Sequence, residues 1–147
     1  MSAEDRNWVV VADTSTAHFY VRHGRRGKLE QLRTLVNEAG RAKAGELISD
    51  SAGRSFDSHG QGRHALASPH DPKETEMIRF AGEVIDSLVT DIQAGNVRRY
   101  ALVASPGFLG QLRHALTRHR VMEPEQSVAK NLVGCSVTDI ASSLKDA

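Results

Sequence analysis

The sequence has few of the residues that characterise secreted, membrane-spanning or base-stacking proteins. Its one cysteine, Cys135, cannot form an internal disulfide, which predicts a reducing compartment. No apolar run approaches the roughly 18 residues that cross a bilayer, and the opening residues MSAEDRN are polar and acidic, unlike a signal peptide. Aromatic residues make up 5% of the chain, too few to build a platform for stacked single-stranded bases. We therefore expect a cytoplasmic protein with no membrane partner.

The chain also lacks an excess of one charge, because its net charge is only +1. The distribution of charge is more informative than its total. Residues 97–122 contain no acidic residue, and residues 58–70 are acid-free as well. The cations of the first stretch are Arg98, Arg99, Arg113, Arg118 and Arg120, with two histidines. Such segregation predicts a cationic surface that binds phosphate weakly and in a salt-dependent way, so we expect structured RNA or the ribosome as a partner.

The remaining composition is that of an ordinary globular protein, with 39% apolar and 25% charged residues in 147 positions. This length predicts a single domain, residues 1–147, that buries about two-thirds of its unfolded surface. The apolar patterns predict three strands, then alternating helices and strands. The expected strands are 8–12, 18–22, 29–36, 100–104 and 127–133, and the expected helices begin near Asp71-Pro72, Ser105-Pro106 and Ser136, with a further short helix at 38–48.

A three-stranded meander followed by βα units is the element order of the ribonuclease-H-like fold. We therefore predict an α/β protein with a mixed sheet of about five strands and helices on both faces. The segments Trp8–Ala12 and Tyr100–Ala104 are short apolar runs bounded by turn residues. This pattern is typical of strands buried on both faces, and it predicts that the two are adjacent, parallel and central.

The segment 49–76 has neither a helical nor a strand period, and a loop this long in a compact domain is usually functional or disordered. Its polar residues include Arg54, Asp57, His59, Gln61, Arg63, His64 and His70. Function collects at the carboxyl ends of strands in α/β sheets. We therefore expect Arg54, Asp57, Arg63 and His64 to lie on one surface near Asp13 and Ser105. Asp57 is expected to pair with an arginine of the loop.

Three kinds of catalytic site are not supported by the residue pattern. A two-metal nuclease needs converging carboxylates, and the strand that ends at Ala104 supplies only Ser105, so Asp13 is expected to cap its own turn. The loop histidines lack the spacing of a zinc site. A triad of Ser58, His64 and Asp57 lacks the Gly-x-Ser-x-Gly turn that exposes a nucleophile. We predict no metal and no cofactor, and whether the chain is an enzyme stays open.

Several motifs in order along the chain resemble one bacterial family. They are WVVVAD (8–13), LISDSAGR (47–54), FDS (56–58), GRH (62–64), DPKE (71–74) and ASPGFLG (104–110). The family that they resemble is labelled "protein required for attachment to host cells", and the resemblance covers nearly the whole chain. It is similar in turn to the middle domain of archaeal and eukaryotic peptide-chain release factors and of Pelota-type rescue factors. That relation also implies a ribonuclease-H-like fold.

The release-factor domain carries a Gly-Gly-Gln motif in the loop before its first long helix, and this chain has His59-Gly60-Gln61-Gly62 in the corresponding loop. The resemblance implies that Gln61 is a candidate catalytic residue for hydrolysis of peptidyl-tRNA, with Gly60 beside it. The departure at His59 argues against that reaction. Three hypotheses follow: an RNA- or ribosome-associated module with a functional loop at 49–76, a factor for attachment to host cells that acts directly or indirectly, and a small peptidyl-tRNA hydrolase. The binding residues expected are Asp13, Arg54, Asp57, Gly60, Gln61, Arg63, His64, Arg98, Arg99 and Arg113.

Overall fold

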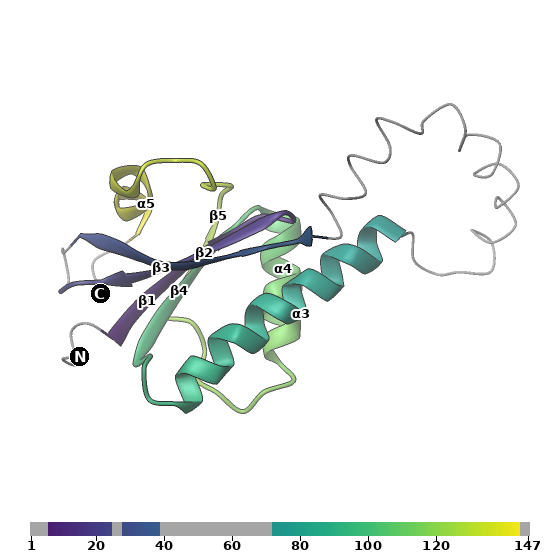
Figure 1. The fold of residues 1–147 in the computed structure, drawn as a ribbon, viewed down its shortest axis with the longest axis horizontal. Coiled ribbons are helices and arrows are strands. Elements are labelled where there is room, and N and C mark those ends of the chain that lie inside the picture. The colour runs from purple at the N-terminus through teal and green to yellow at the C-terminus, as the bar shows by residue number, and fades with distance from the viewer. Residues whose placement is uncertain (1–5, 25–27, 39–71, 145–147) are drawn as a thin grey trace, which may run out of the picture.

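A computed structural model describes residues 6–24, 28–38 and 72–144 (Figure 1). These residues form a five-stranded sheet and three helices. The strands are β1 (Asn7–Ala12), β2 (Thr16–Arg22), β3 (Leu29–Val36), β4 (Arg99–Ala104) and β5 (Gln126–Ala129). The helices are α3 (Pro72–Gln93), α4 (Pro106–Leu116) and α5 (Val137–Ser143).

The sheet is mixed, with strand order β3-β2-β1-β4-β5. The meander β1-β2-β3 is antiparallel, whereas β4 pairs in parallel with both β1 and β5. The prediction that 8–12 and 100–104 are adjacent, parallel and central is therefore confirmed, as is the α/β class with about five strands. The arrangement is consistent with a ribonuclease-H-like fold.

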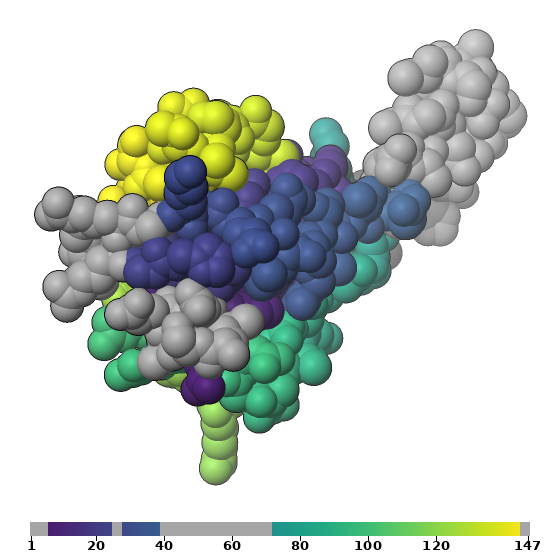
Figure 2. All heavy atoms as spheres, turned by 60° about the vertical axis from the view of Figure 1, so that its left-hand side comes forward, coloured from purple at the N-terminus to yellow at the C-terminus, as the bar shows by residue number. Residues whose placement is uncertain are grey.

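Helices cover both faces of the sheet, as predicted (Figure 1). Because side chains alternate along a strand, Trp8, Val10 and Ala12 of β1 pack in one core with α3 and α4, whereas Val9 and Val11 pack in a second core with α5. In Figure 2 the blue β3 lies between the yellow C-terminal segment and the teal-green α3. Because the side chains of β1 alternate between two buried cores, β1 reads as a continuous apolar run.

The local signals agree with the helix positions, with small differences. α3 begins at Pro72 as expected, and its buried residues lie between Phe80 and Val89. α5 follows Ser136, whose hydroxyl accepts a hydrogen bond from the Asp139 backbone N–H at 3.1 Å. The strand predicted at 127–133 is wrong in its bounds, because β5 pairs with β4 only over Gln126–Ala129 and the chain then turns. The helix expected at 38–48 falls almost wholly outside the described residues.

Candidate functional site

The parallel strands β1 and β4 end side by side, and the chain leaves them in opposite directions, β1 toward β2 and β4 toward β5. Such a switch point is where α/β sheets usually bind ligands. We call this side of the sheet the carboxyl end. Asp13 follows β1 and Ser105 follows β4, and the residues before them, Ala12 and Ala104, are direct partners. Asp13 and Ser105 therefore lie at the same end of two adjacent strands, while the loop residues expected near them lie outside the described residues.

Asp13 stabilises its own turn, as the sequence predicted. Its Oδ1 atom accepts hydrogen bonds from the backbone N–H groups of Ser15 and Thr16, both at 2.8 Å. This is the turn geometry for which aspartate is favoured after a strand. Ser105 precedes α4, and its side chain makes no capping hydrogen bond. One oxygen of Asp13 is thus committed to the fold, and the Ser105 hydroxyl is not used as a cap.

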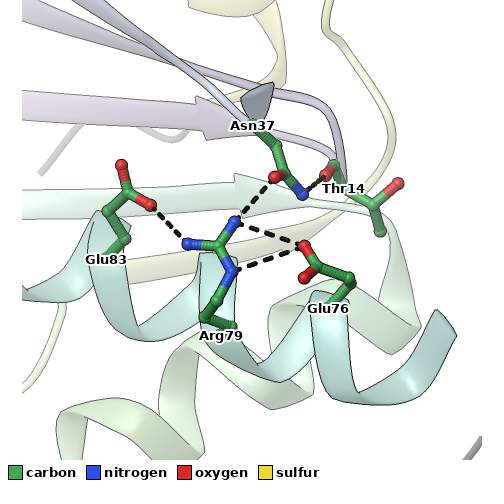
Figure 3. Close-up of polar contacts among 5 residues, drawn as sticks. All are labelled: Thr14, Asn37, Glu76, Arg79 and Glu83. Carbon is green, nitrogen blue, oxygen red and sulfur yellow. Dashed lines mark hydrogen bonds and ion pairs between the residues drawn. The ribbon is translucent and has the colours of Figure 1, made fainter. Parts of the chain in front are cut away.

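An arginine on α3 organises the polar side chains beside this switch point (Figure 3). The Arg79 guanidinium donates to Glu76 at 3.3 and 3.4 Å and to Glu83 at 3.0 Å. It also donates to the Oδ1 atom of Asn37 at 2.7 Å, across 42 residues of sequence. The hydrogen bonds that Arg79 donates to Glu76 and Glu83 raise its pKa. Each carboxylate therefore faces a permanent positive charge.

Asn37 links this arginine to the turn after β1 (Figure 3). It is buried, with 3% of its surface exposed. Its side-chain amide donates to the carbonyl oxygen of Thr14 at 3.1 Å, and its backbone N–H donates to the carbonyl oxygen of Ser15 at 2.8 Å. The Asn37–Arg79 clamp therefore joins the end of β3, the β1–β2 turn and the first turns of α3. It links the strand that precedes residues 39–71 to the helix that follows them.

The carboxylates of Asp13, Glu76 and Glu83 at the carboxyl end have structural partners. They are paired with an arginine or with backbone N–H groups. In the described ranges, no group of three or more His, Cys, Asp or Glu side chains is arranged to hold a metal ion.

The cationic residues expected to bind phosphate lie elsewhere. Arg98 and Arg99 are at the start of β4, on the side of the sheet that we call the amino end. β4 has six residues, so this end lies roughly 20 Å from Asp13. Arg113 is exposed on α4 and donates to the Ser127 hydroxyl at 2.8 Å. The described members of the predicted binding set therefore belong to two separate regions.

The arginines near the amino end differ in their availability. Arg99 lies 3.7 Å from a carboxylate oxygen of Glu125, and His119 lies 3.3 Å from Asp86. The other arginines of this stretch are exposed, and no ion pair with another described residue involves them: they are Arg98, Arg113, Arg118 and Arg120. The remaining predicted site residues, Arg54, Asp57, Gly60, Gln61, Arg63 and His64, lie outside the part of the chain that the structure describes.

Sequence reasoning did not identify the Asn37–Arg79 clamp. Local signals existed for part of it, since Glu76, Arg79 and Glu83 have the three- and four-residue spacings of helical ion pairs. Asn37 directly follows a predicted strand, where a polar residue is unremarkable. Its burial and its pairing with Arg79 depend on how β3 and α3 meet, which no local pattern encodes.

None of the helices in the described ranges is long and apolar enough to span a membrane. A search of curated proteins finds no match to the chain. A family model described as "Protein required for attachment to host cells" matches residues 8–144, which include every strand core and helix described above. The chain therefore belongs to the family of proteins required for attachment to host cells.

Proposed function

We propose that the protein serves attachment to host cells as a binding module that performs no catalysis itself. Membership of the attachment family over residues 8–144 carries the proposal. The geometry of the carboxyl end supports the absence of catalysis. Glu76 and Glu83 pair with Arg79, and Asp13 holds its own turn, so each of these carboxylates already has a structural role.

In this proposal the loop at 49–76 makes the recognition contact, together with Asp13. Its proposed contact residues are Arg54, Asp57, Gly60, Gln61, Arg63 and His64. Connectivity supports this location, because the chain leaves the described fold after Glu38 and returns at Pro72. The hydrogen bond between Asn37 and Arg79 joins β3 to α3 close to both points. A recognition loop needs such a rigid base if its contacts are to be reproducible.

The proposal is tested in the cells that make the protein. Disruption of the gene should lower the number of cells attached to host cells, and the intact gene should restore it. A gene with Arg63→Ala and His64→Ala should not restore attachment, whereas Lys73→Ala, an exposed cation on the first turn of α3, should. Disrupted cells that attach as well as the parent cells would refute the proposal.

Direct and indirect action are separated by adding the purified protein to host cells before the attachment assay. A direct factor occupies host sites and lowers attachment as its concentration rises. An indirect factor acts inside the cells that produce it, so the added protein has no effect while gene disruption still does.

A second candidate function, binding to structured RNA or to the ribosome, is favoured by the exposed arginines near the amino end. Arg98 and Arg113 have no carboxylate partner among the described residues, and few acidic residues interrupt this surface. Such a surface binds phosphates through weak, salt-dependent contacts. The likeness of the loop to that of release-factor middle domains supports the same candidate. Glu125 limits the contribution of Arg99, since it partly neutralises that arginine.

RNA binding is measured by filter retention of a structured RNA at 50 to 300 mM salt. Replacing Arg98, Arg99 and Arg113 with alanine should weaken binding and reduce the salt slope by about one unit or less per lost contact. Arg99→Ala should have the smallest effect of the three. Lys73→Ala is the matched control and should bind as the natural chain does. Absence of binding to RNA and to ribosomes at 50 mM salt excludes this candidate.

A peptidyl-tRNA hydrolase is the third reading, and Gln61 is its candidate catalytic residue. Gln61→Ala should leave RNA binding nearly unchanged. If the natural chain releases no peptide from peptidyl-tRNA, or if Gln61→Ala releases it equally fast, release-factor chemistry is excluded and only a binding role remains.

A further inference from the structure

A small pocket opens at the amino end of the sheet, on the side covered by α5. Its volume is about 30 Å³, which is room for one or two water molecules. This is far below the size of a pocket that encloses a whole cofactor or drug-sized ligand. The pocket therefore has space for a few oxygen atoms of one polar group.

Three polar residues form a row across neighbouring strands in this pocket. Asn7 of β1 is the direct partner of Arg22 of β2 on one side and of Arg99 of β4 on the other. Direct partners project from the same face of a sheet. Two strand spacings separate the arginines, so their Cα atoms lie roughly 10 Å apart. Both long side chains can therefore reach over Asn7 from opposite sides.

The base of the pocket is apolar. Val9 and Ala101 lie beneath the polar row, and Leu144, which follows α5, lines the side. All three residues are buried. An apolar base lowers the local dielectric constant, which strengthens hydrogen bonds and charge interactions.

The charged residues of the lining are two arginines, Arg22 and Arg99, and one carboxylate, that of Glu125. The Arg99–Glu125 separation of 3.7 Å exceeds the 2.7–2.9 Å of a charge-assisted hydrogen bond. Within the described residues no hydrogen bond involves the Arg99 guanidinium, which carries five N–H donors. The Arg99 side chain is 49% exposed, so an incoming ligand can reach it.

We infer that this pocket binds one oxyanion group, a phosphate or a carboxylate, between Arg22 and Arg99, with the Asn7 amide as a third donor. The planar guanidinium matches both groups, because it offers two parallel N–H donors to two oxygens. The volume admits the anionic group only, so the remainder of its ligand lies on the surface outside. The inference rests on neither the attachment role nor RNA binding.

Binding is tested by following the backbone amide signals of the whole chain by NMR. Inorganic phosphate and acetate are added separately, with chloride at matched ionic strength as the reference. Saturable shifts at Val9, Ala101 and Gln126 with phosphate alone would assign the site to phosphate groups, and shifts with acetate alone to carboxylates. Shifts with both would assign it to oxyanions in general. The inference is overturned if neither anion causes a saturable shift beyond that of chloride.

Substitutions identify the arginine that holds the anion. Arg99→Gln removes a charge-assisted hydrogen bond and should weaken binding about tenfold. Lys73→Gln removes the same charge at the opposite end of the sheet and should leave the affinity unchanged. Equal affinities for the natural chain and Arg99→Gln, or equal losses in Arg99→Gln and Lys73→Gln, would overturn the inference.

A second variant keeps both arginines in place. Glu125→Gln removes the competing carboxylate, so the affinity should rise about two- to fivefold, the range expected for an exposed ion pair. This test remains informative even if Arg99→Gln disturbs the fold. A fall in affinity in Glu125→Gln would overturn the inference.

Discussion

The two ends of the sheet use their polar side chains differently. At the carboxyl end, the Asn37–Arg79 clamp joins three segments, and the carboxylates of Glu76 and Glu83 face the same arginine. At the amino end, Arg98 and Arg99 are exposed, and Arg99 lies 3.7 Å from its carboxylate partner Glu125. Polar groups that hydrogen-bond to one another stabilise a fold, whereas exposed polar groups that have no close partner are available to a ligand. The carboxyl end is therefore a scaffold, and the amino end offers binding groups.

The largest effect should come from removing Asn37. Asn37→Ala deletes the amide that donates to Thr14 and accepts from Arg79 in a buried position. Leaving those partners without hydrogen bonds should lower the free energy of unfolding by about 2–3 kcal/mol. Arg98→Ala at the amino end should change it by less than about 0.5 kcal/mol.

Urea denaturation of the two variants measures this difference. A matched pair is appropriate because each variant removes one polar side chain next to the end of a strand. If Asn37→Ala lowers the free energy of unfolding no more than Arg98→Ala does, the proposed contrast between a scaffold end and a binding end is wrong.

Tyr100 is the exception at the amino end, because it is buried there. Its hydroxyl donates to the Met122 carbonyl oxygen at 2.6 Å. Its pKa is raised to about 12, chiefly by burial and in smaller part by the charge of Glu123, against an opposing contribution from Arg113. The neutral phenol is favoured in the folded state. Its contribution to the free energy of unfolding is therefore complete below pH 10 and is lost as the pH rises toward 12. By pH 11 the loss should be about 1.4 kcal/mol.

Tyr100→Phe isolates this effect. Loss of the hydrogen bond should lower the free energy of unfolding by about 1 kcal/mol at neutral pH. Between pH 9 and pH 11 the stability of the variant should fall less steeply than that of the natural chain. Burial also raises the pKa of Tyr20, so a smaller slope should remain in the variant. Denaturation at several pH values measures both slopes, and equal slopes would show that Tyr100 ionises alike in the folded and unfolded chain.

A smaller effect is expected for Arg79, because its side chain is 46% exposed. Arg79→Ala should lower the free energy of unfolding by about 1 kcal/mol or less, since exposed ion pairs contribute little. Part of that cost should disappear in 1 M salt, which screens charges. The double variant with Asn37→Ala should cost less than the sum of the two single variants, because they share one hydrogen bond. Strict additivity would indicate that the clamp does not couple β3 to α3.

Most of the fold could be predicted from the sequence, because its signals are local. The apolar runs Trp8–Ala12 and Tyr100–Ala104 are buried on both faces, which favours central parallel strands. Pro72 and Ser136 indicated where helices begin. β5 was harder, since it has only four residues and none of them is buried. Its bounds depend on pairing with β4 and not on its own pattern.

The candidate site was less predictable. The role of Asp13 followed from turn chemistry and is confirmed. The hydrogen bond between Asn37 and Arg79 joins residues 42 positions apart, and it exists only because β3 and α3 pack together. The row of polar residues in the pocket is equally non-local, because strand register places Arg22 and Arg99 on either side of Asn7. Charge counting alone grouped Arg98 and Arg99 with Arg113 and could not identify that row.

The smallest effect on stability is expected from divalent cations. At the carboxyl end the carboxylates of Glu76 and Glu83 are both paired with Arg79, and β4 leads to Ser105 where a metal site would need a further ligand. A cation that binds only the folded chain at 100 times its dissociation constant would add roughly 2.7 kcal/mol, a shift of several degrees in a domain of this size. We expect the melting temperature to move by less than about 1 °C with EDTA or millimolar magnesium. Arg79→Ala sharpens the comparison, because it releases both carboxylates. Magnesium that stabilises this variant alone would show that ion pairing suppresses metal binding, whereas a shift of several degrees in the natural chain would restore the metal-dependent nuclease hypothesis.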